Sequence, residues 1–81
     1  MERPRKYLRN HKMMVAMCED KLILKYIGQV HDLSPNRVLQ AVRSMVKYLG
    51  IKIDGKYPWS RLEIESVYPE YIAAYIREGG D

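Results

Sequence analysis

The stretch "LSPNRVLQAVRSMVKYLG", residues 33–50, contains the signals of one complete helix. Ser34 is a favoured N-cap, because its hydroxyl can accept a hydrogen bond from an otherwise unpaired backbone N–H. Pro35 follows at the first helical position, where its missing N–H costs nothing, and Gly50 suits the left-handed residue that ends a helix. We therefore predict a helix over 35–49. Its apolar positions fall at helical spacing and form an inward stripe: Val38, Leu39, Val42, Met45, Val46 and Leu49.

The outer face of this predicted helix is basic. Together with Ser34 at its start, the polar positions are Asn36, Arg37, Gln40, Arg43, Ser44 and Lys47. Arginine can pair bidentately with guanine and glutamine with adenine, lysine mostly meets phosphate, and Asn36 can reach a base edge or a phosphate. The DNA major groove is wide enough to admit such a helix. The alternative is that any amphipathic helix needs a polar face toward water.

Two further helices are predicted before this stretch. Asn10 is an N-cap candidate for a helix through Cys18, and Asp20 can cap a second helix that runs to Val30. One continuous helix over 11–30 is an alternative, and "KLILKYI" also has the composition of a strand. The apolar positions of the second helix fall at helical spacing: Ile23, Tyr26, Ile27 and Val30.

After Gly50, the segment "IKIDGKY" has the composition of a short β-hairpin, with Asp54-Gly55 as its turn. Lys52 and Lys56 flank this turn. If the hairpin forms a wing, these two lysines are placed to contact DNA phosphates. The alternative is an ordinary connection between helices.

Two helices are predicted to complete the chain. Ser60 and Glu63 match a capping box, with Trp59 and Ile64 placed as a hydrophobic staple, for a helix to about Val67. Pro69 then begins a final helix that Gly79 and Gly80 end. The apolar face of this last helix can close the core or make a two-fold contact, and we expect a homodimer through it. Its residues are Tyr71, Ile72, Tyr75 and Ile76.

Composition and length set the class of protein. The chain has 81 residues, of which 47% are hydrophobic and 30% charged, which is typical of one small globular domain. No apolar run approaches a membrane span and no signal peptide is evident, so we expect a cytoplasmic protein without a membrane contact.

Cys18 is the sole cysteine and has no metal-ligand spacing with His11 or His31, which favours a role as a small core residue. We expect no metal or other cofactor. No phosphate loop or nucleophile motif indicates an enzyme.

Positive charge is concentrated in two regions of the chain. The net charge is +4 overall, and residues 1–12 carry +4, residues 34–61 carry +5 and residues 62–81 carry −4. Residues 1–9 are predicted to form a flexible basic arm, which can follow a minor groove or serve only as a solubilising tail. The basic residues of this arm are Arg3, Arg5, Lys6 and Arg9. Such segregation is typical of nucleic-acid binders.

The stretch "YIGQVHDLSPNRV" resembles the helix-turn-helix of response-regulator and quorum-sensing output domains. In place of that family's apolar residue and glycine, the turn has His31 and Asp32. The resemblance implies that the helix from Pro35 is a recognition helix. The residues that match are Ile27, Gly28 as the small residue at the close helix approach, Leu33, Ser34, Pro35 and Val38.

The longer run "LILKYIGQVHDLSPNRVLQAVRSMVKYLG" also looks like the core-binding domain of tyrosine recombinases. In that family the catalytic residues lie in a separate domain, for which this chain has no room. Both resemblances imply DNA binding without catalysis, by different docking geometries.

These observations predict a mainly α fold, a helix-turn-helix bundle of four to five helices over residues 10–81, with a β-hairpin wing as an open alternative. The predicted function is sequence-specific binding of double-stranded DNA by a small transcription regulator, of the kind found in prokaryotes, their viruses or plasmids. The rival prediction is a helical protein-interaction module that docks its basic face on an acidic partner.

Overall fold

Five helices make up the fold in the computed structural model, which describes residues 7–80. They are α1 (Tyr7–Cys18), α2 (Leu24–His31), α3 (Pro35–Tyr48), α4 (Arg61–Ser66) and α5 (Tyr68–Arg77). No strand occurs within this described part of the chain. The prediction of a mainly α fold with four to five helices is therefore confirmed. Arg3, Arg5 and Lys6 of the predicted arm lie outside the described residues.

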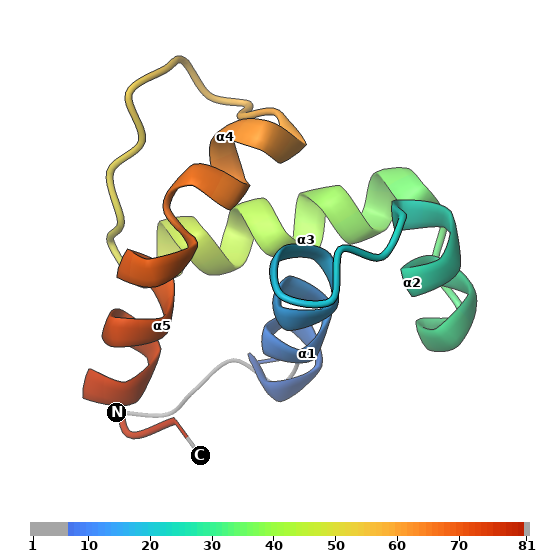
Figure 1. The fold of residues 1–81 in the computed structure, drawn as a ribbon, viewed down its shortest axis with the longest axis horizontal. Coiled ribbons are helices and arrows are strands. Elements are labelled where there is room, and N and C mark those ends of the chain that lie inside the picture. The colour runs from blue at the N-terminus through green and yellow to red at the C-terminus, as the bar shows by residue number, and fades with distance from the viewer. Residues whose placement is uncertain (1–6, 81) are drawn as a thin grey trace.

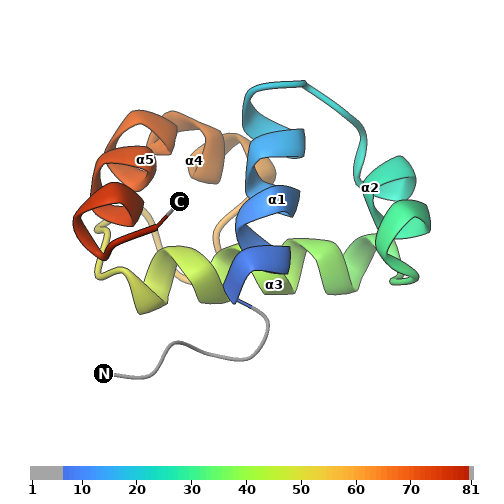
Figure 2. The same cartoon turned by 90° about the horizontal axis from the view of Figure 1, so that it is seen from below.

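The long helix α3 is the centre of the fold (Figure 1). The short helix α2 packs at its N-terminal end, α1 packs against its middle, and α4 and α5 lie toward its C-terminal end (Figures 1 and 2). Viewed from below, α3 lies along one edge and the other four helices are all on the same side of it (Figure 2). One long face of α3 is thus not covered by any other helix of residues 7–80.

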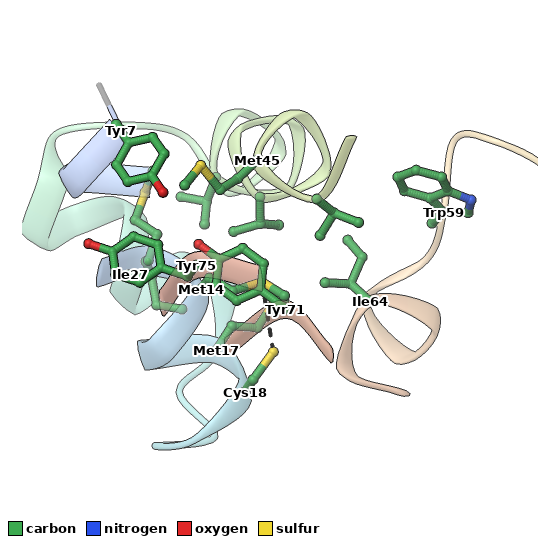
Figure 3. Close-up of a cluster of buried hydrophobic side chains, with 14 residues drawn as sticks. Tyr7, Met14, Met17, Cys18, Ile27, Met45, Trp59, Ile64, Tyr71 and Tyr75 are labelled. Carbon is green, nitrogen blue, oxygen red and sulfur yellow. Dashed lines mark hydrogen bonds between the residues drawn. The ribbon is translucent and has the colours of Figure 1, made fainter. Parts of the chain in front are cut away.

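The core fills the space between α3 and these helices (Figure 3). Its fully buried side chains come from α1 (Met13, Met14, Met17), α2 (Ile27), α3 (Val38, Val42, Met45, Val46), α4 (Ile64) and α5 (Tyr71). Full burial of such a side chain stabilises the fold by about 1.5–3 kcal/mol. Cys18 is also buried, and burial raises the pKa of its thiol to about 12, so it behaves as the predicted core residue.

The face of α5 that was predicted to pair two subunits is largely used inside the chain. Tyr71 and Tyr75 are buried, and the ring of Tyr75 stacks on His11 with centroids 3.6 Å apart. Nδ1 of His11 lies 3.2 Å from the hydroxyl of Tyr71. The prediction that these two tyrosines make a dimer contact is corrected: they close the core. Ile76 is exposed and Ile72 is half-buried, and a dimer contact through α5 stays a prediction that rests on them.

Helix α1 begins at Tyr7, three residues before the predicted N-cap Asn10. The reason is tertiary, because the ring of Tyr7 is buried and stacks on Tyr75 with centroids 5.3 Å apart. Arg9, which the sequence assigned to the flexible arm, therefore lies in the first turn of α1.

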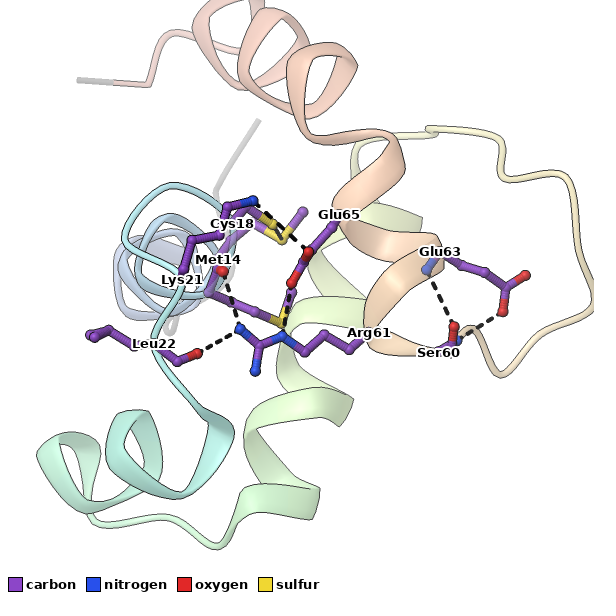
Figure 4. A network of polar contacts seen from close by, with 9 residues as sticks. Met14, Cys18, Lys21, Leu22, Ser60, Arg61, Glu63 and Glu65 are labelled. Carbon is purple, nitrogen blue, oxygen red and sulfur yellow. Dashed lines mark hydrogen bonds and ion pairs between the residues drawn. The ribbon is translucent and has the colours of Figure 1, made fainter.

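The predictions for the start of α2 are wrong. The chain leaves α1 at Cys18, Lys21 takes a left-handed φ of 58°, and α2 begins at Leu24, so neither a cap at Asp20 nor a continuous helix over 11–30 occurs. A distant side chain holds this link in place, because the guanidinium of Arg61 donates to the carbonyl of Leu22 at 2.7 Å (Figure 4). A partner so far along the chain overrides local capping preferences.

The turn between α2 and α3 is tight. Asp32 adopts φ 57° and ψ 46°, the left-handed conformation for which glycine is usual, and the N–H of Leu33 donates to the carbonyl of Gly28 at 2.7 Å. A Cβ on Gly28 would lie 2.2 Å from the Leu33 carbonyl oxygen, so only glycine fits the approach without movement. The predicted cap on α3 is confirmed, since Ser34 accepts from the N–H of Arg37 at 3.3 Å.

The C-terminal end of α3 is also as predicted. Gly50 takes φ 75°, its N–H donates to the carbonyl of Lys47, and the N–H of Ile51 donates to the carbonyl of Val46. This pair of hydrogen bonds satisfies carbonyls that the last turn leaves without partners.

Residues 51–60 form an extended connection without strands, which agrees with the alternative of an ordinary connection and not with a β-hairpin wing. The only turn bond within it joins the N–H of Gly55 to the carbonyl of Ile53 at 2.8 Å. Ile51 and Ile53 pack against the core and Trp59 is buried in it, so both ends of the segment are tied to the fold and not to each other. Three residues on each side of a turn also provide few cross-strand hydrogen bonds.

The predicted capping box on α4 is confirmed. The hydroxyl of Ser60 accepts from the N–H of Glu63 at 3.2 Å, and the carboxylate of Glu63 accepts from the N–H of Ser60 at 3.0 Å (Figure 4). Trp59 and Ile64, the predicted staple, belong to the same core cluster. The chain then bends at Val67 into α5, which Gly79 follows with φ 83°.

Candidate nucleic-acid interface

The uncovered face of α3 carries the residues that were predicted to contact DNA. The helix has 14 residues and is about 21 Å long at the ordinary rise per residue. Its inward side is the buried apolar stripe, and its outward side is mainly polar, with Pro35 and Tyr48 as exposed apolar residues at its two ends. The exposed polar positions are Ser34, Asn36, Arg37, Gln40, Ser44 and Lys47.

Arg43 differs from these residues because it is half-buried and engaged in the fold. Its Nε donates to the main-chain carbonyl of Trp59, which fastens the 51–60 connection to α3. Lys47 lies beside it, with Nζ 5.0 Å from the centroid of the exposed Tyr57 ring. These two contacts place the connection along the C-terminal half of α3. Among the described residues, the connection does not extend over the N-terminal half of α3, from Asn36 to Ser44.

A groove separates the first turn of α1 from the first half of α3. Its lining residues are Arg9, Asn10, Leu33, Arg37, Gln40, Ala41 and Ser44. Arg9 is oriented by its neighbour, because its Nη2 and Nε lie 3.2 and 3.4 Å from Oδ1 of Asn10. In Figure 2 the start of α1 crosses in front of α3. The sequence analysis placed Arg9 in the arm and did not predict that it lies near α3. Only the position at which α1 begins could have indicated this contact.

The basic residues differ in whether a carboxylate neutralises them. Arg61 pairs with Glu65 at 2.8 Å and Lys21 reaches the same carboxylate at 3.9 Å, so these two cations belong to the fold (Figure 4). Within residues 7–80, no ion pair involves α3 or Arg9. Lys52 and Lys56 are exposed on the 51–60 connection. Half of the acidic side chains in residues 7–80 lie on or next to α4 and α5: Glu63, Glu65, Glu70 and Glu78. Asp32 lies in the turn before α3, and Asp54 lies on the 51–60 connection between the two lysines.

Helix α2 presents an apolar stripe to solvent. Of its four apolar positions at helical spacing, only Ile27 is buried, whereas Ile23, Tyr26 and Val30 are 61%, 51% and 63% exposed. Helical spacing therefore predicted which residues share this stripe. It did not predict that only Ile27 packs in the core and that the other three are exposed to solvent.

The described residues contain neither a candidate metal site nor a membrane-spanning helix. Across residues 7–80, His, Cys, Asp and Glu side chains do not gather in groups of three or more that could hold a metal ion. None of the described helices combines the length and the apolar character that crossing a membrane requires.

Comparisons of the chain with protein-family models, with curated proteins and with solved structures gave no match. The fold and the face of α3 therefore carry the functional argument by themselves.

Proposed function

We propose that this chain binds double-stranded DNA sequence-specifically, as a small transcription regulator that inserts α3 into the major groove. The observation that carries the proposal is the uncovered long face of α3, on which every cation lacks a carboxylate partner within residues 7–80. A helix with side chains is about 10–12 Å across, which matches a major groove about 12 Å wide.

The placement of the side chains supports a division of roles along α3. Asn36, Arg37, Gln40 and Ser44 lie on the open N-terminal half, which is the half of a recognition helix that reads base edges in helix-turn-helix proteins. Three lysines are suited to contact DNA phosphates. They are Lys47, which lies over Tyr57 of the 51–60 connection, and Lys52 and Lys56 on that connection itself. Arg43 has a structural role in the proposal, because its guanidinium holds the carbonyl of Trp59.

The test begins with selection of preferred sites from a random duplex pool, followed by fluorescence anisotropy on the selected duplex. We expect Arg37→Ala or Gln40→Ala to weaken binding by about 1–3 kcal/mol, the usual value of a bidentate base contact, and to relax specificity at one position. Arg77→Ala is the control, because Arg77 is exposed on α5 and its removal changes the net charge equally. Equal losses in Arg37→Ala and Arg77→Ala would contradict reading by α3.

The rival proposal is a protein-interaction module whose basic face docks on an acidic partner. It predicts no selected sequence and no duplex binding at low salt, whereas a DNA-binding protein releases condensed counterions and loses affinity steeply as salt rises. The salt series therefore separates the two.

A further inference from the structure

The groove between α1 and α3 contains two arginines from different helices. Arg9 comes from the first turn of α1 and Arg37 from the first turn of α3, so the fold brings together two cations that are 28 positions apart in the chain. Gln40, Ser44 and Asn10 complete the polar lining. Each of these three can donate a hydrogen bond, and none carries a negative charge.

The charge of this groove is positive only. No carboxylate lies within ion-pair distance of Arg9 or Arg37 in the described part of the chain, and the groove itself has no acidic lining residue. Two guanidinium groups that line one groove raise the positive potential there, which favours the binding of an anion. A guanidinium matches the geometry of phosphate oxygens bidentately, and arginine is favoured over lysine at such sites.

We propose that this groove binds one phosphate of the DNA backbone, with Arg9 as its ligand, while Arg37 on the opposite helix keeps the base contact proposed for it above. The inference rests on the proposed function and specifies how α1 takes part in it. The Asn10 side chain orients the Arg9 guanidinium, and the groove borders the open half of α3. A phosphate held there fixes the angle and the depth of α3 in the major groove. Arg9 is thereby a phosphate-positioning residue and not a minor-groove ligand.

The experiment compares Arg9→Gln with Lys12→Gln. Lys12 is exposed on the same helix and is outside the groove lining, so both variants remove one positive charge from α1. Affinity for the selected duplex is measured by anisotropy across a salt series, and circular dichroism checks that each variant keeps its helix content.

We expect Arg9→Gln to flatten the slope of log K against log salt by about 0.9 and to weaken binding about eightfold near 0.1 M salt. The preference among sequences should not change, because a phosphate contact carries no base information. Lys12→Gln should leave the slope unchanged. A duplex series with single methylphosphonate linkages then locates the contact: one neutral linkage weakens the native protein but has no effect on Arg9→Gln.

The outcomes separate this inference from the function on which it rests. If the native protein binds duplex DNA but Arg9→Gln and Lys12→Gln behave alike, the groove does not hold a phosphate and the inference is overturned while DNA binding stands. If the native protein binds no duplex at low salt, the proposed function itself fails. Loss of sequence preference in Arg9→Gln would show a base contact and would also overturn the assignment to phosphate.

Discussion

Replacing Gly28 with alanine tests the packing on which the orientation of α3 depends. The added Cβ would lie 2.2 Å from the main-chain oxygen of Leu33, far inside the 3.4 Å at which ordinary contact begins. This oxygen belongs to the backbone, so it cannot move away by a change of rotamer, as the end of a flexible side chain can. The turn must therefore open, and the hydrogen bond from the Leu33 N–H to the Gly28 carbonyl lengthens with it.

The expected loss of stability can be worked out from opposing effects. Alanine favours the helical state over glycine by about 1 kcal/mol. Overpacking costs about 1–3 kcal/mol and weakening a hydrogen bond about 1 kcal/mol more. We therefore expect a net destabilisation of about 1–3 kcal/mol for Gly28→Ala. For a domain of this size, that lowers the melting temperature by roughly 4–8 °C per kcal/mol.

The assay is thermal and urea unfolding, followed by circular dichroism in the far ultraviolet. Gln29→Ala is the matched control, because Gln29 is the exposed neighbour on α2 and its truncation should change stability by less than about 0.5 kcal/mol. A Gly28→Ala protein as stable as the native protein would show that the turn is not closed as described, and the argument for the orientation of α3 would fail.

Two further predictions concern residues that hold the helices together. Arg61→Met should destabilise the fold by about 1–3 kcal/mol in urea unfolding, because it removes charge-assisted hydrogen bonds to Leu22 and Glu65, whereas Arg77→Met should have little effect. Burial lowers the pKa of His11, so protonation favours the unfolded state and stability should fall as the pH drops through about 6.5. The melting temperature should therefore fall more between about pH 7.5 and 5.5 in the native protein than in His11→Phe, and equal decreases would contradict this account.

The sequence predicted most accurately the features that depend on neighbouring residues. The caps at Ser34 and Ser60 and the left-handed Gly50 all formed, because a helix end needs only side chains and backbone groups a few residues away. The helix-turn-helix resemblance implied a close approach at Gly28, and the structure has one there, to the backbone of Leu33 in the turn before α3.

The failed predictions each involve a partner distant in the chain. Asp20 is a good local N-cap, yet the start of α2 is displaced by the contact between Arg61 and the Leu22 carbonyl, 39 positions apart. For residues 51–60, composition left a hairpin and an ordinary connection open, because it does not reveal that the apolar side chains of this segment pack on the core. An apolar face likewise does not say whether it covers the core or a partner, and the tyrosines of α5 cover the core.

The candidate interface was predicted in outline but not in its detail. Periodicity placed Arg37, Gln40 and Ser44 on one face of α3, and they are exposed there. The same periodicity could not distinguish Arg43, whose contact with Trp59 removes it from that face, or bring Arg9 to the groove. Both assignments depend on the packing of segments that are separate in sequence.

The most direct test of the central claim is a map of amide chemical-shift changes in isotope-labelled protein on addition of the selected duplex at low salt. If α3 enters the major groove, the largest changes should lie over residues 34–44 and at Arg9, with small changes on α5. Changes confined to the exposed stripe of α2 or to α5, or the absence of any change, would contradict the account.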